Sequence, residues 1–168
     1  LYDGSDNFRG GVQVGDQLYS EDHLWRTGEL GGDVTRPLAG GAIKLNALAT
    51  HRHRRNDDDF VQSLGGAAIG GFYQDFDDYR DERVARLAWS RTGLAGWTVE
   101  IGGEGAFNRL RTDLNVFNID GNDRRTPVDL PIDDATVSEY RAEGFANAGR
   151  QLTGKLRLDL GINYEVSR

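Results

Sequence analysis

Strict alternation of apolar and polar residues near the end of the chain constrains the fold more than any other feature. In residues 155–168, KLRLDLGINYEVSR, every even-numbered position from 156 to 166 is apolar, whereas the odd-numbered positions carry charged, polar or glycine residues. Successive side chains of a β-strand point to opposite faces, so a strand here would have one apolar and one polar face. A helix would scatter both sets around its circumference. The segment therefore predicts an amphipathic strand.

The same alternation predicts strands elsewhere in the chain. They are expected over 24–36, 42–54, 80–91, 97–110 and 137–148, with a weaker run over 8–14 that sets Phe8, Val12 and Val14 against Arg9 and Gln13. No stretch has helical periodicity. We therefore expect an all-β, antiparallel fold of six to seven strands, each about 11 to 14 residues long and thus longer than the usual strand of a soluble sheet.

The expected connections alternate in length. Short turns containing glycine are predicted at 37–41, 92–96 and 149–154, where a tight reversal needs a residue that tolerates positive φ. Long polar connections, rich in Asp, Asn and Gly, are predicted at 55–79 and 111–136. The chain is therefore expected to form successive hairpins with short turns at one end and long loops at the other.

Composition excludes several classes of protein and site. The chain has no cysteine, which excludes disulfides, thiolate metal sites and a cysteine nucleophile. Its formal net charge of −7 argues against nucleic acid as a partner, because phosphate binding needs a basic surface. No apolar run approaches the ~18 residues of a membrane-spanning helix. The chain begins at Leu1 without methionine, so we expect residues 1–168 to be one incomplete domain of a longer or processed protein.

The lengths of the strands and the positions of their aromatic residues predict a transmembrane β-barrel. Trp97 and Phe107 lie ten residues apart on one face, a span of roughly 25 Å in a tilted strand, which matches the apolar band of an outer-membrane barrel. Trp89 and Trp97 flank one short turn, whereas Phe107, Tyr140 and Tyr164 lie near the opposite ends of their strands. We expect these five to form two aromatic girdles at the membrane interfaces, with Leu158 facing lipid near mid-membrane and Asp159 facing the lumen.

Two other architectures share part of this pattern. A soluble antiparallel sandwich also has alternating strands, and its terminal aromatic residues would simply belong to the core. However, a sandwich gives no reason for long connections at one end only, whereas outer-membrane barrels have short periplasmic turns and longer outer loops. A passive, porin-like barrel remains the other alternative.

The strand segments resemble the barrel hairpins of TonB-dependent outer-membrane receptors. The resemblance is carried by RTGELGGDVTRPLAGGAIKLNALATHRHR, FYQDFDDYRDERVARLAWSR, WTVEIGGEGAFNRL and SEYRAEGFANAGRQLTGKLRLDLGINYEVSR, and covers residues 24–168. The last segment is similar to the family's G-x-R-x-E strand, with Asn163 where the family usually has arginine. The plug domain and the TonB box have no counterpart in this sequence.

The resemblance implies location in the bacterial outer membrane and active uptake of a scarce ligand, such as a metal chelate, a vitamin or a glycan fragment. It implies no enzymatic activity and no cofactor. The implied partners are the remaining barrel strands and the plug of the same receptor, the TonB complex, and outer-membrane lipid with its lipopolysaccharide.

Several polar clusters contain residue types that can bind metal ions, but each is explained more simply as exposed polar or charged residues. His51 and His53 share a strand face, but the basic residues at 52, 54 and 55 would repel a cation. The acidic groups at 57–59 and at 75, 77 and 78 are more typical of solvated loop charge. NIDGND at 118–123 resembles a calcium loop, yet Val116 and Pro127 stand where that loop needs oxygen ligands. No metal site is predicted.

One aromatic group lies in the connection expected at 55–79. Phe72, Tyr73, Phe76 and Tyr79 could stack on an incoming ligand, or could equally pack this loop against its neighbour. No Ser-His-Asp order, phosphate-binding loop or isolated carboxylate pair is present, so no catalytic residue is predicted.

Overall fold

The computed structural model describes residues 2–9 and 11–168. Leu1 and Gly10 lie outside the described residues, as do the side chains of Gln13 and Val14, and with them part of the facing predicted for 8–14. The described chain forms an antiparallel β-sheet of eight strands and contains no helix, which confirms the all-β prediction. Accordingly, the described chain offers no helix long and apolar enough to cross a membrane.

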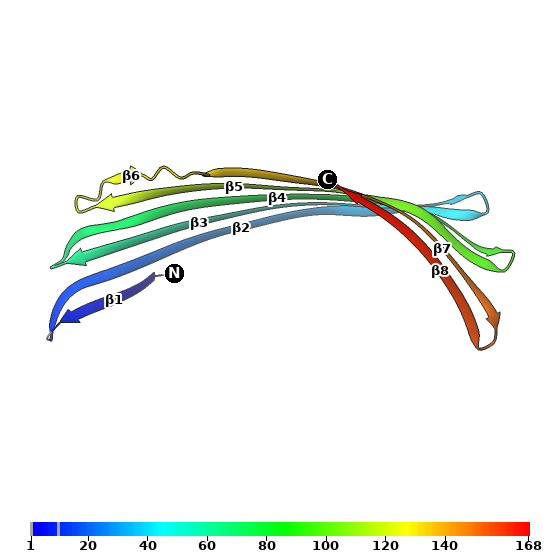
Figure 1. The fold of residues 1–168 in the computed structure, drawn as a ribbon, viewed down its shortest axis with the longest axis horizontal. Helices are drawn as coiled ribbons and strands as arrows, with labels where there is room; N and C mark the ends of the chain where they lie inside the picture. The colour runs from blue at the N-terminus through cyan, green and yellow to red at the C-terminus, as the bar shows by residue number, and fades with distance from the viewer. Residues whose placement is uncertain (1, 10) are drawn as a thin grey trace. The chain divides into compact units, whose positions relative to one another are not determined.

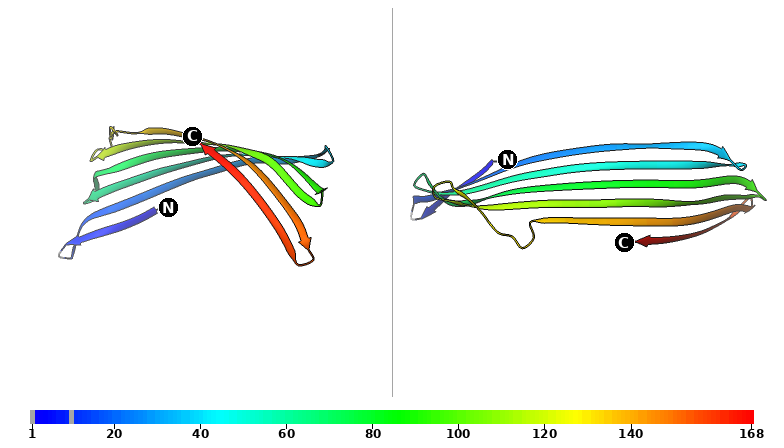
Figure 2. Two further views of the ribbon diagram at one scale, coloured as in Figure 1. Left: turned by 45° about the vertical axis from the view of Figure 1, so that its right-hand side comes forward. Right: turned by 90° about the horizontal axis from the view of Figure 1, so that it is seen from above.

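The strands follow one another in the sheet almost in chain order (Figure 1; Figure 2). They are β1 (Tyr2–Arg9), β2 (Val12–Leu38), β3 (Gly41–Leu64), β4 (Ala67–Leu94), β5 (Trp97–Asp120), β6 (Arg125–Pro127), β7 (Asp134–Thr153) and β8 (Leu156–Ser167). The order is β1-β2-β3-β4-β5-β7-β8, and the short β6 pairs with β5. β1 and β8 are the free edges, so the sheet is open. The expected transmembrane barrel, of which these strands would form one segment, is not established by an open sheet.

Most strands are about twice as long as predicted. β2, β3, β4, β5 and β7 have 27, 24, 28, 24 and 20 residues. The single weak strand predicted over 8–14 is wrong, because β1 ends at Arg9 and β2 begins at Val12. Strand pairing therefore extends well beyond the segments in which apolar residues alternate.

The long loop predicted at 55–79 is also wrong. β3 continues to Leu64, β4 begins at Ala67, and Gly65 and Gly66 reverse the chain with φ of 60° and 82°. This left-handed conformation is one that glycine adopts without steric cost. The polar residues on either side form strands because their charges pair across β3 and β4, a contact that alternation with apolar residues does not reveal.

The second long connection, predicted at 111–136, is partly correct. β5 extends to Asp120, β6 follows at Arg125–Pro127, and β7 begins at Asp134. The irregular part is tied back to β5 by two backbone hydrogen bonds, from Val128 N to Val116 O at 2.8 Å and from Leu114 N to Asp133 O at 2.7 Å.

Two of the three short turns lie where they were predicted. Ala39–Gly40 and Ala95–Gly96 are two-residue turns with positive φ at both positions, the geometry that matches the twist of paired strands. The third turn, predicted at 149–154, lies at Gly154–Lys155, so β7 is longer than expected.

The long strands pass through two compact units. Unit 1 comprises residues 1–27, 52–79 and 110–137, and contains the Gly65–Gly66 turn and β6. Unit 2 comprises residues 28–51, 80–109 and 138–168, and contains the three predicted short turns.

Candidate functional site

The two faces of β8 in unit 2 differ completely in chemistry. On one face, Leu156, Leu158, Leu160, Ile162, Tyr164 and Val166 are 38–74% exposed. On the other face, Arg157 Nε donates to Asp159 Oδ1 at 2.9 Å. β8 pairs with β7 in continuous register from Ala142–Val166 to Gln151–Arg157, so the predicted alternation is present in a paired strand. Unit 2 thus has an apolar face, on which these six residues lie, and a polar face.

Trp89 and Trp97, two of the five residues predicted to lie at a membrane interface, are both half-buried. Trp89 Nε1 donates to Leu38 O at 2.9 Å, beside the Ala39–Gly40 turn. The Arg150 guanidinium lies 5.9 Å from the centre of the Trp97 ring. Each tryptophan thus has a polar partner and lies near a short turn.

The other three predicted aromatic residues do not form a single row. The rings of Phe107 and Tyr140 are 4.8 Å apart and lie within β5 and β7 rather than at strand ends. Tyr164 pairs with Gly144, four residues further along β7 than Tyr140. The pair at 107 and 140 is a local contact that spacing along single strands could not predict.

The polar face of unit 2 carries a network of ion pairs centred on Arg86. Its guanidinium contacts Glu100 at 3.1 Å and Glu104 at 3.9 Å, and Arg141 contacts Glu104 at 3.4 Å. The Arg86 guanidinium also covers the Phe145 ring at 4.1 Å. Phe145 is only 7% exposed although it belongs to the polar face. Arg86, Arg141, Glu100 and Glu104 are therefore paired with one another.

Gly102 makes room for Phe145 on this face. A Cβ built at Gly102 would lie 2.6 Å from Phe145 Cζ and would also collide with the backbone oxygen of Leu87. The alternation pattern could not predict this packing, because it places Phe145 on a face of charged residues.

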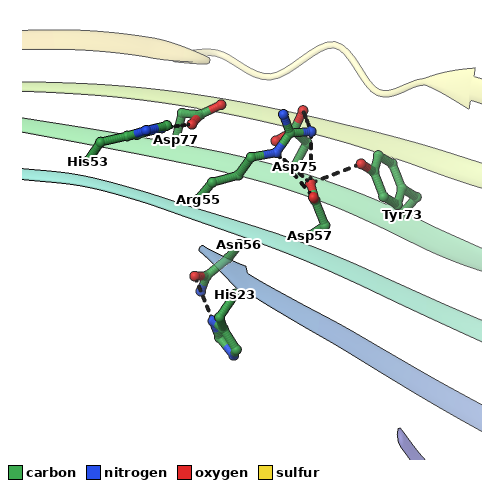
Figure 3. Close-up of polar contacts among 8 residues, drawn as sticks. All are labelled: His23, His53, Arg55, Asn56, Asp57, Tyr73, Asp75 and Asp77. Carbon is green, nitrogen blue, oxygen red and sulfur yellow. Dashed lines mark hydrogen bonds and ion pairs between the residues drawn. The ribbon is translucent and has the colours of Figure 1, made fainter. Parts of the chain in front are cut away.

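Unit 1 contains a polar cluster around Arg55, on β3 and β4 (Figure 3). Arg55 contacts Asp57 at 3.1 Å and Asp75 at 3.4 Å, and the Tyr73 hydroxyl donates to Asp57 at 3.1 Å. Asp75 Oδ1 is buried and has no hydrogen-bond partner. Arg55 thus contacts two carboxylates, of which Asp57 also accepts a hydrogen bond from Tyr73 whereas Asp75 has one buried oxygen without a partner.

This inequality shifts the pKa values of the two carboxyls in opposite directions. For Asp57, burial raises the pKa, but hydrogen bonds from Arg55 and Tyr73 outweigh it and hold the pKa below its usual range. For Asp75, burial is the largest effect and raises the pKa, and Arg55 offsets it only in part. Burial also raises the pKa of Tyr73, together with its bond to Asp57.

All three histidines contact carboxylates. His53 Nε2 lies 2.5 Å from Asp77 with its ring stacked on Tyr79 at 4.3 Å, and His51 Nδ1 lies 2.8 Å from Asp81. His23 hydrogen-bonds Asn56 at 2.8 Å (Figure 3), and its pKa is raised, chiefly by this bond and further by Glu21. Within the described residues, no group of three or more histidine, aspartate or glutamate side chains could hold a metal ion.

The NIDGND segment forms a turn. Asp120 Oδ1 accepts hydrogen bonds from Asn122 N at 2.8 Å and Arg124 N at 3.0 Å, which lower the pKa of its carboxyl. Arg125 then contacts Asp59 on β3 at 3.0 Å and covers the Tyr73 ring at 4.1 Å. The 121–133 segment is therefore tied to β3 and β4 through one arginine.

The four aromatic residues predicted as ligand-binding candidates do not come together. Tyr73 and Tyr79 alternate with Phe72 and Phe76 on opposite faces of β4. Phe72 stacks on Phe60 at 5.4 Å, Tyr73 contacts Phe117 at 5.9 Å, and Arg54 covers Phe76 at 5.3 Å. Each ring already has a partner from a neighbouring strand, which fits the packing interpretation.

No protein-family model matches the chain, and no curated protein is recognisably similar to it.

Proposed function

We propose that this chain is part of the barrel wall of a TonB-dependent receptor in the bacterial outer membrane, which takes up a scarce ligand such as a metal chelate, a vitamin or a glycan fragment. One observation carries the proposal: the apolar face of β8 is exposed along its whole length, and no second layer among the described residues covers it. In a soluble sandwich a second sheet would bury such a face. In an outer-membrane barrel the lipid covers it.

The open edges of the sheet support the same proposal. The outward edges of β1 and β8 carry backbone N–H and C=O groups that no described strand pairs. In lipid each unpaired group would cost several kcal/mol, so further strands must pair there in the assembled barrel. A porin-like barrel would satisfy these edges equally well. The two are distinguished by a plug domain inside the barrel and by whether uptake depends on TonB.

The orientation follows from the 121–133 segment, which is the longest connection between the described strands. The two-residue Gly65–Gly66 turn joins β3 to β4 at the same end of the antiparallel strands. We place the 121–133 segment and the Gly65–Gly66 turn outside the cell, and the turns at Ala39–Gly40, Ala95–Gly96 and Gly154–Lys155 in the periplasm.

Added trypsin tests location and orientation together. In intact cells of a Gram-negative host that expresses the full-length protein, cleavage is expected after Arg124 or Arg125 and not near the 92–96 turn. Cleavage confined to the 92–96 turn would reverse the orientation. Recovery of the protein in the soluble fraction, without detergent, would exclude the membrane proposal and favour a soluble sheet.

A further inference from the structure

An open pocket of about 430 Å³ lies in unit 2, near the Ala95–Gly96 and Gly154–Lys155 turns. Four neighbouring strands of the sheet, β4, β5, β7 and β8, contribute to it. Its volume falls within the ~300–1,000 Å³ of small-molecule sites. The polar side chains that line it are those of Ser90, Thr98, Glu100, Asn147, Arg157 and Asp159. The pocket thus combines the size of a ligand site with a polar lining.

The pairing of β7 with β8 fixes the face on which the pocket opens. Asn147 pairs directly with Gly161, and Gly149 pairs directly with Asp159. A Cβ built at Gly161 would lie 2.7 Å from Asn147 Oδ1, and one built at Gly149 would lie 2.5 Å from Asp159 Oδ1. A Cβ points to the face on which its own residue lies. Both polar side chains are therefore on the same face as the glycines opposite them.

This face is the polar face of unit 2. Phe145 is two residues before Asn147 on β7 and so shares its face, and the Arg86 guanidinium covers the Phe145 ring. Arg86 also contacts Glu100, which lines the pocket together with Thr98 two residues before it. The pocket therefore opens on the side opposite to the exposed leucines of β8.

The charged side chains of the pocket are already paired. Arg157 Nε donates to the two oxygens of Asp159 at 2.9 and 3.0 Å. Glu100 is in contact with Arg86 at 3.1 Å. The positive and negative groups therefore balance, and the pocket offers no single excess charge to attract an ion of the opposite sign. This balance favours an uncharged ligand.

Three uncharged side chains supply further hydrogen-bonding groups. The hydroxyls of Ser90 and Thr98 and the amide of Asn147 make no hydrogen bond to another described residue. Each hydroxyl both donates and accepts, and the amide offers two donors and one acceptor. The three residues stand on β4, β5 and β7, which are adjacent in the sheet. Among the described residues no aromatic side chain lines the pocket, so a flat aromatic ligand would find no ring to stack on.

We propose that this pocket binds a neutral sugar, of one or two rings, through the side chains of Ser90, Thr98 and Asn147. Sugar hydroxyls are uncharged and both donate and accept hydrogen bonds, which matches the balanced charges and the mixed donors and acceptors of the lining. Gly149 and Gly161 have no side chain, so the polar groups opposite them lie low over the sheet and leave room for a ring. The inference rests on the proposed function, because it selects the glycan fragment among the ligands named there.

The test measures the binding of maltose, cellobiose and lactose to the full-length protein by isothermal titration calorimetry, in a detergent that has no sugar headgroup. At least one of the three is expected to bind, and Asn147→Ala should weaken its binding at least tenfold. Asn163→Ala is the matched control, because Asn163 pairs with Phe145 on the same face of the same hairpin and lies outside the pocket. This control should change the affinity less than twofold.

A second pair of variants tests a single hydroxyl. Thr98→Val removes the hydroxyl at nearly constant volume and is expected to weaken binding about threefold to tenfold, the loss of one hydrogen bond. Thr92→Val makes the same change on β4 outside the pocket, and should have less than a twofold effect. Circular dichroism confirms that each variant keeps its strands.

The wild-type protein supplies a third comparison, which needs no variant to fold. Added salt should leave its affinity for the neutral disaccharide unchanged, and the anionic disaccharide digalacturonate should bind more weakly. Tighter binding of digalacturonate, no binding of the three neutral disaccharides, or equal affinity of Asn147→Ala and the wild type would overturn the inference. Those results, for a protein still found in the outer membrane, leave the proposed function standing with another ligand. Recovery of the protein without membrane excludes the proposed function, whatever the sugars do.

Discussion

Units 1 and 2 are built from the same strands, yet they differ in how charged and apolar side chains are distributed over the two faces. In unit 2 one face of β8 is wholly apolar and exposed, and the charges gather on the other face around Arg86. In unit 1 both faces of β3 and β4 carry charge, and arginines of β3 pair with aspartates of β4: Arg54 with Asp78 at 3.5 Å, and Arg55 with Asp75 at 3.4 Å. The same strands therefore continue through both units, while the side-chain contacts that accompany the backbone pairing differ between them.

Because of this contrast, the stability of each unit should respond to different changes. If lipid surrounds unit 2, the middle of its apolar face tolerates no added charge, whereas the strands of unit 1 depend on ion pairs that salt and pH can weaken.

A charge introduced on the apolar face of unit 2 should cause the largest loss of stability. Ile162 is 73% exposed and pairs with Ala146, well inside β8. It is the better probe of mid-membrane than Leu158, which pairs with Arg150 close to the Gly154–Lys155 turn. Ile162→Arg is expected to lower the free energy of unfolding in lipid vesicles by about 2–4 kcal/mol.

The matched control lies on the other face of the same strand. Glu165 pairs directly with Glu143, so two like charges face each other and Glu165→Arg replaces a repulsion with an attraction. This variant should unfold at the same or a slightly higher denaturant concentration than the wild type. Equal losses from both variants would remove the assignment of one face to lipid. Asp159, expected to face the lumen, is less suitable as a control, because it already pairs with Arg157.

A methyl group at Gly102 should destabilise unit 2 by about 1–3 kcal/mol, because it would overpack the site that holds Phe145. Gly105 lies on the same strand, and a Cβ there would meet nothing within 4 Å. In equilibrium unfolding, Gly102→Ala should therefore lose stability and Gly105→Ala should lose little. A similar response of the two would argue against tight packing on the polar face.

In unit 1, the segment 121–133 should become easier to cleave when its ion pair to β3 is removed. Asp59→Asn removes the charge that holds Arg125, a half-exposed pair that contributes about 0.5–1 kcal/mol. Trypsin should then cleave after Arg125 several-fold faster in the purified protein. Asp129→Asn, an exposed carboxylate on the same segment, serves as the control and should leave the rate unchanged. Unchanged cleavage in Asp59→Asn would mean that backbone bonds alone hold the segment.

The smallest expected effect concerns the two carboxyls beside Arg55. The lowered pKa of Asp57 means that its charged form stabilises the fold above its unfolded pKa, and that this stability is lost as pH falls through the folded pKa. The raised pKa of Asp75 has the opposite sign, so ionisation of Asp75 reduces stability as pH rises through its folded pKa.

Two amide variants distinguish the stabilising effect of ionised Asp57 from the destabilising effect of ionised Asp75 at neutral pH. Asp57→Asn should lower the melting temperature of unit 1, whereas Asp75→Asn should leave it unchanged or raise it. Melting curves at pH 4 and pH 7 provide the measurement, and the difference between the variants should shrink at pH 4. A larger loss from Asp75→Asn at pH 7 would reverse the assignment of the two carboxyls.

The sequence by itself determined the all-β antiparallel class, the two faces of β8 and the turns at Ala39–Gly40 and Ala95–Gly96. These features are local, because side-chain alternation and positive φ are properties of neighbouring residues. For Phe72 and Tyr73 the sequence favours packing against a neighbouring strand and stacking on a ligand equally. It cannot choose between them, because the partner of each ring lies on another strand.

Only the tertiary structure decided where the strands end and what their polar residues contact. β3 and β4 continue through the charged residues 55–64 and 67–79, because Arg54 and Arg55 find aspartates on the opposing strand. Likewise, the pocket beside Asn147 and the site that holds Phe145 depend on inter-strand register. Register brings together residues that are distant in the chain, and a pattern read along one strand carries no information about which residues those are.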